Sequence, residues 1–391
     1  MRMVHSIDKI FKSINNIIMN FLFYKCWTSI FLLFLLPFLV VSTTYTVGAH
    51  NLTKQTLKNS NSSNNILAIF VFGDSTVDPG NNNHINTIFR GDFPPYGVDY
   101  PNQIPTGRFS NGMLATDLIA SYAGIKQSIP AYLDPSLSLE DLITGVSFAS
   151  AGTGYDPLTA AKTGVIDMSK QLEYLDEYKI RVKSMIGKRR MKELIKRSLF
   201  LVSCGTNDIM FTYGIVESPL QPFTAPTYLR FLLDKSKSFI QGLKDRGAEM
   251  IAVVGLPPIG CLPAVMTIHI TTQRRCVESL SSLAIDFNHL LINELNIMQA
   301  SQPISMLVYA DIYAPLLDQI IHPTKYGFDE VNKGCCGTGL LEASFICNSL
   351  MNMCNDRSKY IFWDAIHPTE RSYSLIFEAL RPLIDSILGK L

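Results

Sequence analysis

Residues 66–78 read ILAIFVFGDSTVD, an apolar run from Ile66 to Phe72 followed by the polar turn Gly73-Asp74-Ser75. A near-continuous apolar run that ends in turn residues is typical of a strand buried on both faces of a parallel sheet. In such sheets ligands bind beyond the carboxyl ends of the strands. Ser75 is therefore predicted to lie on a tight turn at the edge of the sheet where binding sites form.

The same pattern returns along the chain and alternates with helical patterns. Short apolar runs bounded by Gly, Asp or Pro predict strands, and apolar residues at three- and four-residue intervals predict helices. This alternation predicts an α/β fold, a three-layer α/β/α sandwich around a parallel sheet. Because no break in composition follows Ile66, residues 66–391 are predicted to form one domain. The predicted strands are 66–72, 145–149, 199–204, 250–255 and 306–310, and the predicted helices are 113–122, 169–186, 228–246, 277–299 and 370–388.

The composition and charge limit the classes of partner. The chain has 391 residues, of which 47% are hydrophobic and 17% are charged, and this profile is that of a globular protein. Its 34 basic and 33 acidic residues leave a formal net charge of +1. Proteins that bind nucleic acids neutralise phosphates with an excess of basic side chains. This chain has no such excess, so no nucleic-acid partner is expected.

The first 49 residues differ from the rest of the chain. Basic residues precede an uncharged apolar run from Ile30 to Val41, and Val47-Gly48-Ala49 follows it. This order is typical of a secretory signal peptide. Residues 1–49 are therefore predicted to be removed by cleavage after Ala49, and the protein is predicted to be secreted and extracellular. The apolar run is shorter than the roughly 20 residues that cross a bilayer, so no stable membrane span is expected after cleavage. The leader is longer than usual, and an uncleaved anchor is the alternative.

Residues 50–65 are rich in Asn, Ser, Thr and Lys and show no apolar period. Such a composition predicts a flexible polar extension between the signal peptide and the domain. Two glycosylation sequons fall in it, Asn51-Leu-Thr53 and Asn61-Ser-Ser63. In a secreted protein both asparagines are candidates for N-glycosylation.

Six of the eight cysteines are clustered in the C-terminal half of the sequence. In an oxidising compartment they predict three disulfides, and a zinc site is the weaker alternative because paired CxxC knuckles are missing. Cys261 and Cys276 flank one loop and are predicted to pair. Two connectivities remain for the other four residues, once a bond between the adjacent Cys335 and Cys336 is excluded. These four cysteines are Cys335, Cys336, Cys347 and Cys354. Cys204 lies in an apolar run and is predicted to be a buried free thiol.

Turn residues also follow other predicted strands, as in Gly152-Thr153-Gly154 and Gly205-Thr206-Asn207-Asp208. Each motif alone is explained by turn or helix-cap preferences. Together they indicate a cleft at the carboxyl edge of the sheet. The segment 93–101, rich in Pro and Tyr, either borders this cleft or forms a surface loop.

A serine hydroxyl at this edge needs a base before it can act as a nucleophile. His322 and His367 both occur in the tetrapeptide Ile-His-Pro-Thr. Only His367 has Asp364 three residues before it, and this spacing allows a carboxylate to orient the imidazole and leave its other nitrogen free to accept a proton. His322 is predicted to be a histidine at a helix end, and His84 stays a second candidate for the cleft.

Several stretches resemble, in order, the motifs of the plant-type GDSL esterases and lipases, which are Ser-Gly-Asn-His (SGNH) hydrolases. Phe70–Asp78 with Asn81-Asn82-Asn83 matches the first block, and Asp364-Ala-Ile-His367 matches the last. The resemblance covers nearly all of the predicted domain. The intervening matches are residues 107–112, 147–154, 205–208, 255–261 and 335–339.

The resemblance implies the flavodoxin-like α/β/α fold of the SGNH hydrolases, without a metal or organic cofactor. It implies that Ser75 is the nucleophile and that Asp364 and His367 are its orienting and basic partners. Ser75, Gly152 and Asn207 would form the oxyanion hole. Thr76 stands where the family has leucine, and no chemical role is expected for that side chain.

These features predict a secreted serine hydrolase that forms an acyl-enzyme on Ser75. The family suggests lipid or carbohydrate acyl esters as substrates. An acyltransferase that uses the same acyl-enzyme is one alternative, and a catalytically idle carbohydrate- or lipid-binding module is another. The sequence holds no G-x-S-x-G elbow, phosphate loop, H-E-x-x-H pair or G-x-G-x-x-G motif, which argues against the other common hydrolase and nucleotide-binding classes.

Overall fold

The opening apolar run forms strand β1 (Ala68–Gly73), and all six of its residues are buried. It belongs to a parallel sheet of four strands in the order β1-β2-β3-β4, with β2 at Ser198–Ser203, β3 at Met250–Val254 and β4 at Met306–Ala310. This computed structural model describes residues 66–213, 224–270, 272–301 and 304–390. The predicted signal peptide, the polar extension and both sequons lie outside these residues.

The prediction of a regular strand over 145–149 is wrong. The segment runs along β1 and hydrogen-bonds to it, with Val71 N–H donating to the Val146 carbonyl at 3.1 Å and Phe148 N–H donating to the Val71 carbonyl at 2.7 Å. The only bridges in the segment are made by Ser147, to Val71 on one side and to Ala131 on the other. Gly145, with φ of +102°, breaks the extended backbone at the start of the segment. The segment therefore lies between β1 and residues 130–132 as an irregular extension of the sheet.

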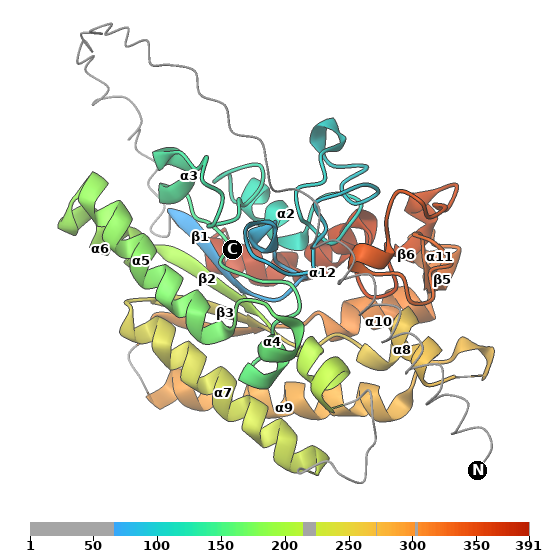
Figure 1. Cartoon of the computed structure of the whole chain (residues 1–391). Helices are drawn as coiled ribbons and strands as arrows, with labels where there is room; N and C mark the ends of the chain where they lie inside the picture. The colour runs from blue at the N-terminus through green and yellow to red at the C-terminus, as the bar shows by residue number, and fades with distance from the viewer. Residues whose placement is uncertain (1–65, 214–223, 271, 302–303, 391) are drawn as a thin grey trace, which may run out of the picture. The chain divides into compact units, whose positions relative to one another are not determined.

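Helices cover both faces of the sheet, which gives the predicted three layers. Figure 1 shows α5, α7 and α9 on one side of the strands and α2 and α12 on the other. The five predicted helices are all present, with shifts of up to three residues at their ends. The helices are α2 (Ala115–Tyr122), α3 (Leu139–Ile143), α4 (Pro157–Thr163), α5 (Met168–Ile186), α6 (Lys188–Lys196), α7 (Ala225–Asp245), α8 (Pro263–Ile268), α9 (Glu278–Ser301), α10 (Tyr313–Ile321), α11 (Pro323–Tyr326) and α12 (Glu370–Leu388).

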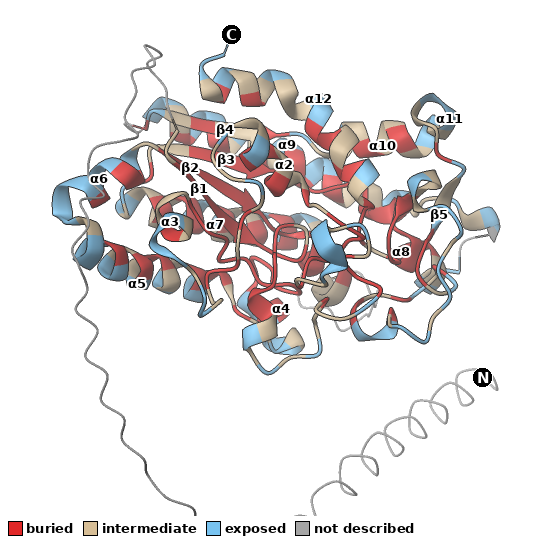
Figure 2. Cartoon of the chain, turned by 90° about the horizontal axis from the view of Figure 1, so that it is seen from above, coloured by how far each residue is buried: buried red, intermediate tan, exposed pale blue. Residues whose placement is uncertain are grey.

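The two faces of the sheet are packed with different kinds of side chain. On the α5–α7–α9 face the aromatic rings of Phe70, Phe72 and Phe200 lie within 6.2 Å of a neighbouring ring. On the α2–α12 face the strands present smaller side chains, such as Val71 and Ala252. Strands β1 and β2 are buried along their whole length, whereas β4 is partly buried at three of its five residues (Figure 2). The sheet is thus covered largely by aromatic side chains on one face and by aliphatic side chains on the other.

All six clustered cysteines form disulfides, as predicted. Cys261 pairs with Cys276, and the structure selects one of the two open connectivities, Cys335–Cys354 with Cys336–Cys347. The last two bonds lie beside a small parallel sheet of β5 (Glu330–Gly334) and β6 (Tyr360–Phe362). Cys204 is a buried free thiol, which confirms that prediction.

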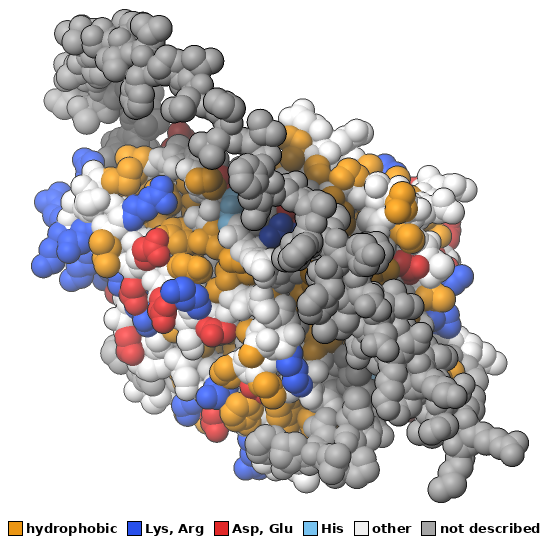
Figure 3. Space-filling view, in the orientation of Figure 1, with side chains coloured by type: hydrophobic (Ala, Val, Ile, Leu, Met, Phe, Trp, Pro, Cys, Tyr) orange, Lys and Arg blue, Asp and Glu red, His pale blue; other side chains and the backbone are white. Residues whose placement is uncertain are grey.

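Helix α6 is one of the elements that the sequence analysis missed. It buries Met191, Leu194 and Ile195, while Lys and Arg side chains gather over it on the face seen in Figure 3. In sequence these basic residues hide the apolar period that marks a helix. Among the described helices, none is both long enough and apolar enough to cross a bilayer.

Candidate active site

Ser75 lies two residues beyond the end of β1 and is almost fully buried, with an exposed fraction of 7%. The turn that carries it requires glycine at residue 73, because φ is +134° and a Cβ there would lie 1.8 Å from the Ser203 carbonyl oxygen. The buried side chain of Gln171, from α5, holds Gly73 on both sides. Its Oε1 accepts from Gly73 N–H at 2.8 Å and its Nε2 donates to the Gly73 carbonyl at 3.0 Å. The turn that carries Ser75 is therefore fixed by the sheet and by α5.

Asp74 and Thr76 lock the same turn from within. One Asp74 carboxylate oxygen accepts from Thr76 N–H at 3.0 Å and from Thr76 Oγ1 at 2.8 Å, and Thr76 Oγ1 also lies 3.0 Å from Ser203 Oγ. Burial raises the pKa of Asp74 to about 6. No chemical role was predicted for Thr76, and its hydroxyl has a structural one, because it ties the turn to the end of β2. A leucine could not make these bonds.

His367 joins Ser75 to Asp364 in one hydrogen-bonded line. Its Nε2 lies 2.7 Å from Ser75 Oγ, and its Nδ1 lies 2.9 and 2.8 Å from the two carboxylate oxygens of Asp364. Asp364 also accepts from the His367 backbone N–H at 2.8 Å, so the D-x-x-H spacing closes a tight turn just before α12. Both side chains are buried. The structure thus brings together the three residues that the sequence analysis selected.

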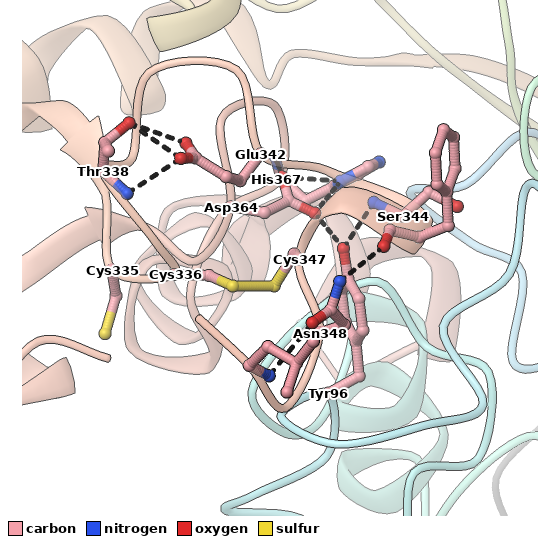
Figure 4. Close-up of a disulfide and its surroundings, with 12 residues drawn as sticks. Tyr96, Cys335, Cys336, Thr338, Glu342, Ser344, Cys347, Asn348, Asp364 and His367 are labelled. Atoms are coloured by element: carbon pink, nitrogen blue, oxygen red, sulfur yellow. Dashed lines mark hydrogen bonds and ion pairs between the residues drawn. A yellow bond between two sulfur atoms is a disulfide. The ribbon is translucent and has the colours of Figure 1, made fainter. Parts of the chain in front are cut away.

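Tyr96 completes this line and was not singled out from the sequence. It comes from the Pro- and Tyr-rich segment, is 1% exposed, and donates its hydroxyl to Asp364 Oδ2 at 2.7 Å (Figure 4). Burial and the neighbouring carboxylate raise the pKa of Tyr96 well above its ordinary value, so its hydroxyl stays protonated and donates. Ser344 N–H donates to the same hydroxyl at 2.8 Å. The segment 93–101 therefore borders the site.

Two backbone amides and one side-chain amide are free to stabilise an oxyanion. Neither Ser75 N–H nor Gly152 N–H has a hydrogen-bond partner among the described residues. Gly152 has φ of +89°, a conformation that favours glycine. Asn207 follows β2 and uses one hydrogen of its Nδ2 to reach the Thr153 carbonyl at 2.8 Å, which leaves the other available.

Asparagines of the first motif hold the Gly152 loop against the Ser75 turn. Asn81 Nδ2 donates to the carbonyls of Ser147 and Ala149, both at 2.8 Å, and Asn82 Nδ2 donates to the Ala151 carbonyl at 2.9 Å. These buried bonds hold the segment 147–151 against the segment that follows β1. The motif thus has a structural purpose that its sequence alone did not reveal.

Asp208 fixes the Gly152 loop from the opposite side. Its carboxylate accepts from Tyr155 N–H at 2.7 Å, Asp156 N–H at 3.1 Å and Thr159 Oγ1 at 2.6 Å. A Cβ on Gly154 would lie 2.1 Å from Asp208 Oδ1, so glycine permits this close approach. Burial raises the pKa of Asp208 to about 7, although these donors lower it.

The other two candidate histidines lie outside this arrangement. His322 is at the end of α10, its side chain is 60% exposed, and its Nδ1 lies 2.8 Å from Asp318 Oδ1, which confirms the prediction of a helix-end histidine. His84 was a second candidate for the cleft, but it is exposed at the end of a short helical turn (Asn81–His84), and that expectation is wrong. The buried asparagines of that turn, rather than its histidine, face the site.

No metal-binding cluster occurs in the part of the chain that the structure describes, where no three or more His, Cys, Asp or Glu side chains are arranged to hold an ion. Separately, the Ser75 turn and the segments around it bring together a hydroxyl, an imidazole, a carboxylate and amide groups. These groups suit nucleophilic attack on a carbonyl carbon followed by stabilisation of the negative oxygen.

Comparison with known proteins places this site in a family. The family described as GDSL-like Lipase/Acylhydrolase matches residues 69–380. GDSL esterase/lipase At5g45960 from Arabidopsis thaliana is 50% identical over 329 residues, which are 83% of this chain and 88% of that protein. GDSL esterase/lipase At1g06990 from the same plant is 43% identical over 324 residues, or 82% of this chain and 90% of that protein.

Among solved structures, the lipase Lip_vut3 from a goat rumen metagenome aligns with 81% of this chain and 96% of its own, at 13% identity and a TM-score of 0.35. That similarity is too weak to bear on fold or function. The match of the family over most of the chain and the close plant relatives establish the assignment. This chain belongs to the GDSL-like lipase/acylhydrolase family of carboxylic ester hydrolases.

Proposed function

We propose that this chain hydrolyses carboxylic esters through an acyl-enzyme on Ser75, with His367 as the base and Asp364 as its orienting partner. The observation that carries the proposal is the 2.7 Å contact between Ser75 Oγ and His367 Nε2, with Asp364 bound to Nδ1 on the other side of the ring. A neutral imidazole that donates Nδ1–H to a carboxylate has Nε2 free to accept the serine proton.

The reaction proceeds in two halves. His367 Nε2 accepts the proton of Ser75 Oγ as the oxygen bonds to the ester carbonyl carbon, and the alcohol then leaves with that proton. Water next gives a proton to Nε2 and attacks the acyl carbon, the bond to Ser75 Oγ breaks, and the serine recovers its proton. The products are a carboxylic acid and an alcohol.

The negative oxygen of each tetrahedral intermediate needs donors that are already in place. Ser75 N–H, Gly152 N–H and Asn207 Nδ2 are the groups we assign to this task. The missing partners of the two backbone amides support the assignment, because donors that are already paired cannot act without rearrangement.

We infer that the substrates are lipid or carbohydrate acyl esters and that the protein acts outside the cell. Relatives named esterase/lipase support the substrate class. Three disulfides support an oxidising compartment.

The test is turnover combined with covalent labelling of the oxidised protein. We expect hydrolysis of p-nitrophenyl acetate and labelling by a fluorophosphonate at Ser75, both lost in Ser75→Ala and both retained in a control, Ser184→Ala, on the exposed face of α5. Folded protein that neither turns over the ester nor labels would contradict the proposal and favour an idle binding module.

A further inference from the structure

An apolar cavity of about 100 Å³ opens from the Ser75 turn into the interior of the protein. It lies between the strands and the two helices α2 and α12, on the face of the sheet that carries the smaller side chains. Ser75 and Asn207 line one end of it, and Ile66 and Leu388 line the other. The cavity thus begins at the catalytic groups and follows β1 back toward its start.

The register of the sheet orders the lining residues by depth. Val254 and Ala310 pair at the level where β1 ends, next to the Ser75 turn. Leu201 and Ala252 pair one level deeper, and both line the cavity. The level of Ala252 corresponds to Val71, four residues before Ser75, which is about 13 Å along a strand.

Small side chains keep this space open. Packed interiors contain few voids larger than a water molecule, because the atoms around a void lose their contacts. Here Ala115, Ala252 and Ala310 line the gap among larger side chains, most of them Leu, Ile and Val. The void is continuous with the active site, whereas a random packing defect would have no reason to begin there.

The distribution of polar groups selects the occupant. Asp74, Ser75, Ser203 and Asn207 are polar lining residues at or beside the turn, whereas the lining residues farther back along the strands, Ile69, Leu199 and Leu201, are aliphatic. A ligand that fits has a carbonyl at the opening and a hydrocarbon tail behind it. We propose that the cavity holds the acyl chain of the ester, a subsite that rests on the proposed hydrolysis at Ser75.

The depth of the cavity sets the length of that chain. An extended alkyl chain advances roughly 1.25 Å per carbon, so about ten carbons reach the level of Ala252. The occupant is a medium-length acyl chain of about eight to ten carbons.

The first experiment compares p-nitrophenyl acetate, butyrate, octanoate, decanoate and palmitate on the wild-type protein. We expect kcat/KM to rise at least tenfold from acetate to octanoate and decanoate, and to fall again for palmitate. A rate that is independent of chain length while acetate is hydrolysed would overturn the subsite and leave the proposed function standing.

Filling the cavity midway gives the sharper test. In Ala252→Leu, kcat/KM for octanoate should fall at least tenfold more than kcat/KM for acetate, and Ala115→Leu on α2 should give the same ordering. The matched control is Ala300→Leu on the exposed face of α9, which should change neither rate. Equal losses for both esters in both cavity variants would overturn the proposal.

A binding measurement separates the subsite from the chemistry. 1-Decanol should raise the melting temperature of Ser75→Ala, which cannot turn over, and should not raise that of Ser75→Ala/Ala252→Leu. Stabilisation by 1-decanol without hydrolysis of any ester by the wild type would support the cavity and overturn the proposed function. No stabilisation of Ser75→Ala would overturn the cavity.

Discussion

His367 and His322 share the tetrapeptide Ile-His-Pro-Thr, but their surroundings differ. His367 is buried between Ser75 and Asp364, whereas His322 is exposed on α10. We expect His367→Ala to lower kcat by more than about 10³, because the serine loses its base. His322→Ala should keep kcat within about twofold. Steady-state kinetics on a short ester measures both, and the reverse ranking would assign the base to His322.

Asn207 is the only side-chain donor among the three groups assigned to the oxyanion. Its interaction with the substrate oxygen strengthens in the transition state, so Asn207→Ala should lower kcat by about 10²–10³ and change KM little. A thermal melt of the same variant checks that loss of the bond to Thr153 has not unfolded the loop. A raised KM with unchanged kcat would contradict the assigned role.

Tyr96→Phe removes one hydroxyl and keeps the ring. The change leaves Asp364 Oδ2 without its donor and Ser344 N–H without its acceptor. Because hydrogen bonds to charged groups contribute roughly 1.5–3 kcal/mol, we expect kcat to fall about tenfold with KM nearly constant.

Tyr122→Phe is the matched control for that change. Its hydroxyl donates to Asp385 at 2.6 Å, far from the nucleophile, so the same chemical deletion should leave kcat unchanged. Equal kcat in the wild type and Tyr96→Phe would show that Tyr96 contributes packing alone.

The site residues that could be predicted are those whose spacing carries chemistry. Asp364 and His367 are three residues apart, and Ser75 follows a buried strand, so both features are visible in the sequence. Tyr96 and Gln171 reach the site from a loop and from a helix face, and no local pattern marks them. Their roles exist only after distant segments have packed.

At the scale of elements, the predicted strands are those that are buried on both faces. The same rule failed where a strand is polar, as in β5, whose sequence Glu-Val-Asn-Lys-Gly holds residues that are depleted in strands. It also failed for 145–149, where an apolar run pairs with β1 but its backbone is broken by Gly145. Burial alone does not dictate a regular strand.

Asp208 links the segment after β2 to the segment that contains Tyr155 and Thr159. Its ionisation should therefore affect the stability of the fold. Burial raises its pKa to about 7, whereas an aspartate in the unfolded chain titrates near 4. Between these values the folded protein keeps a proton that the unfolded chain has released. The stabilising contribution is therefore complete below about pH 4 and is lost as the pH rises through about 7.

Asp208→Asn removes this titration. From pH 4 to 7 the free energy of unfolding of the variant should fall less steeply than that of the wild type, by up to about 1.4 kcal/mol per pH unit. Urea unfolding at each pH measures the slopes, and Asp286→Asn on the exposed face of α9 is the control. Identical slopes for wild type and Asp208→Asn would contradict the argument.

At the scale of the whole molecule, one disulfide holds a C-terminal loop that contacts Tyr96 beside Asp364. The bond Cys336–Cys347 encloses the stretch that includes Ser344, whose N–H holds the Tyr96 hydroxyl. Cys336→Ser/Cys347→Ser should lower the free energy of unfolding by about 2–4 kcal/mol and also lower kcat. Cys204→Ala, at the buried free thiol, should leave kcat unchanged. Unaltered unfolding of the double variant would show that this bond is dispensable.

Ser75 and His367 are separated by 292 positions in the chain. At roughly 5–20 residues per second, a ribosome needs about 15–60 s to add the residues between them. On the proposed mechanism, the emerging polypeptide carries an inert alcohol at Ser75 throughout that interval. The synthesising cell would then meet the reactive enzyme only when translation is nearly over, and a product that ends before His367 would leave esters intact.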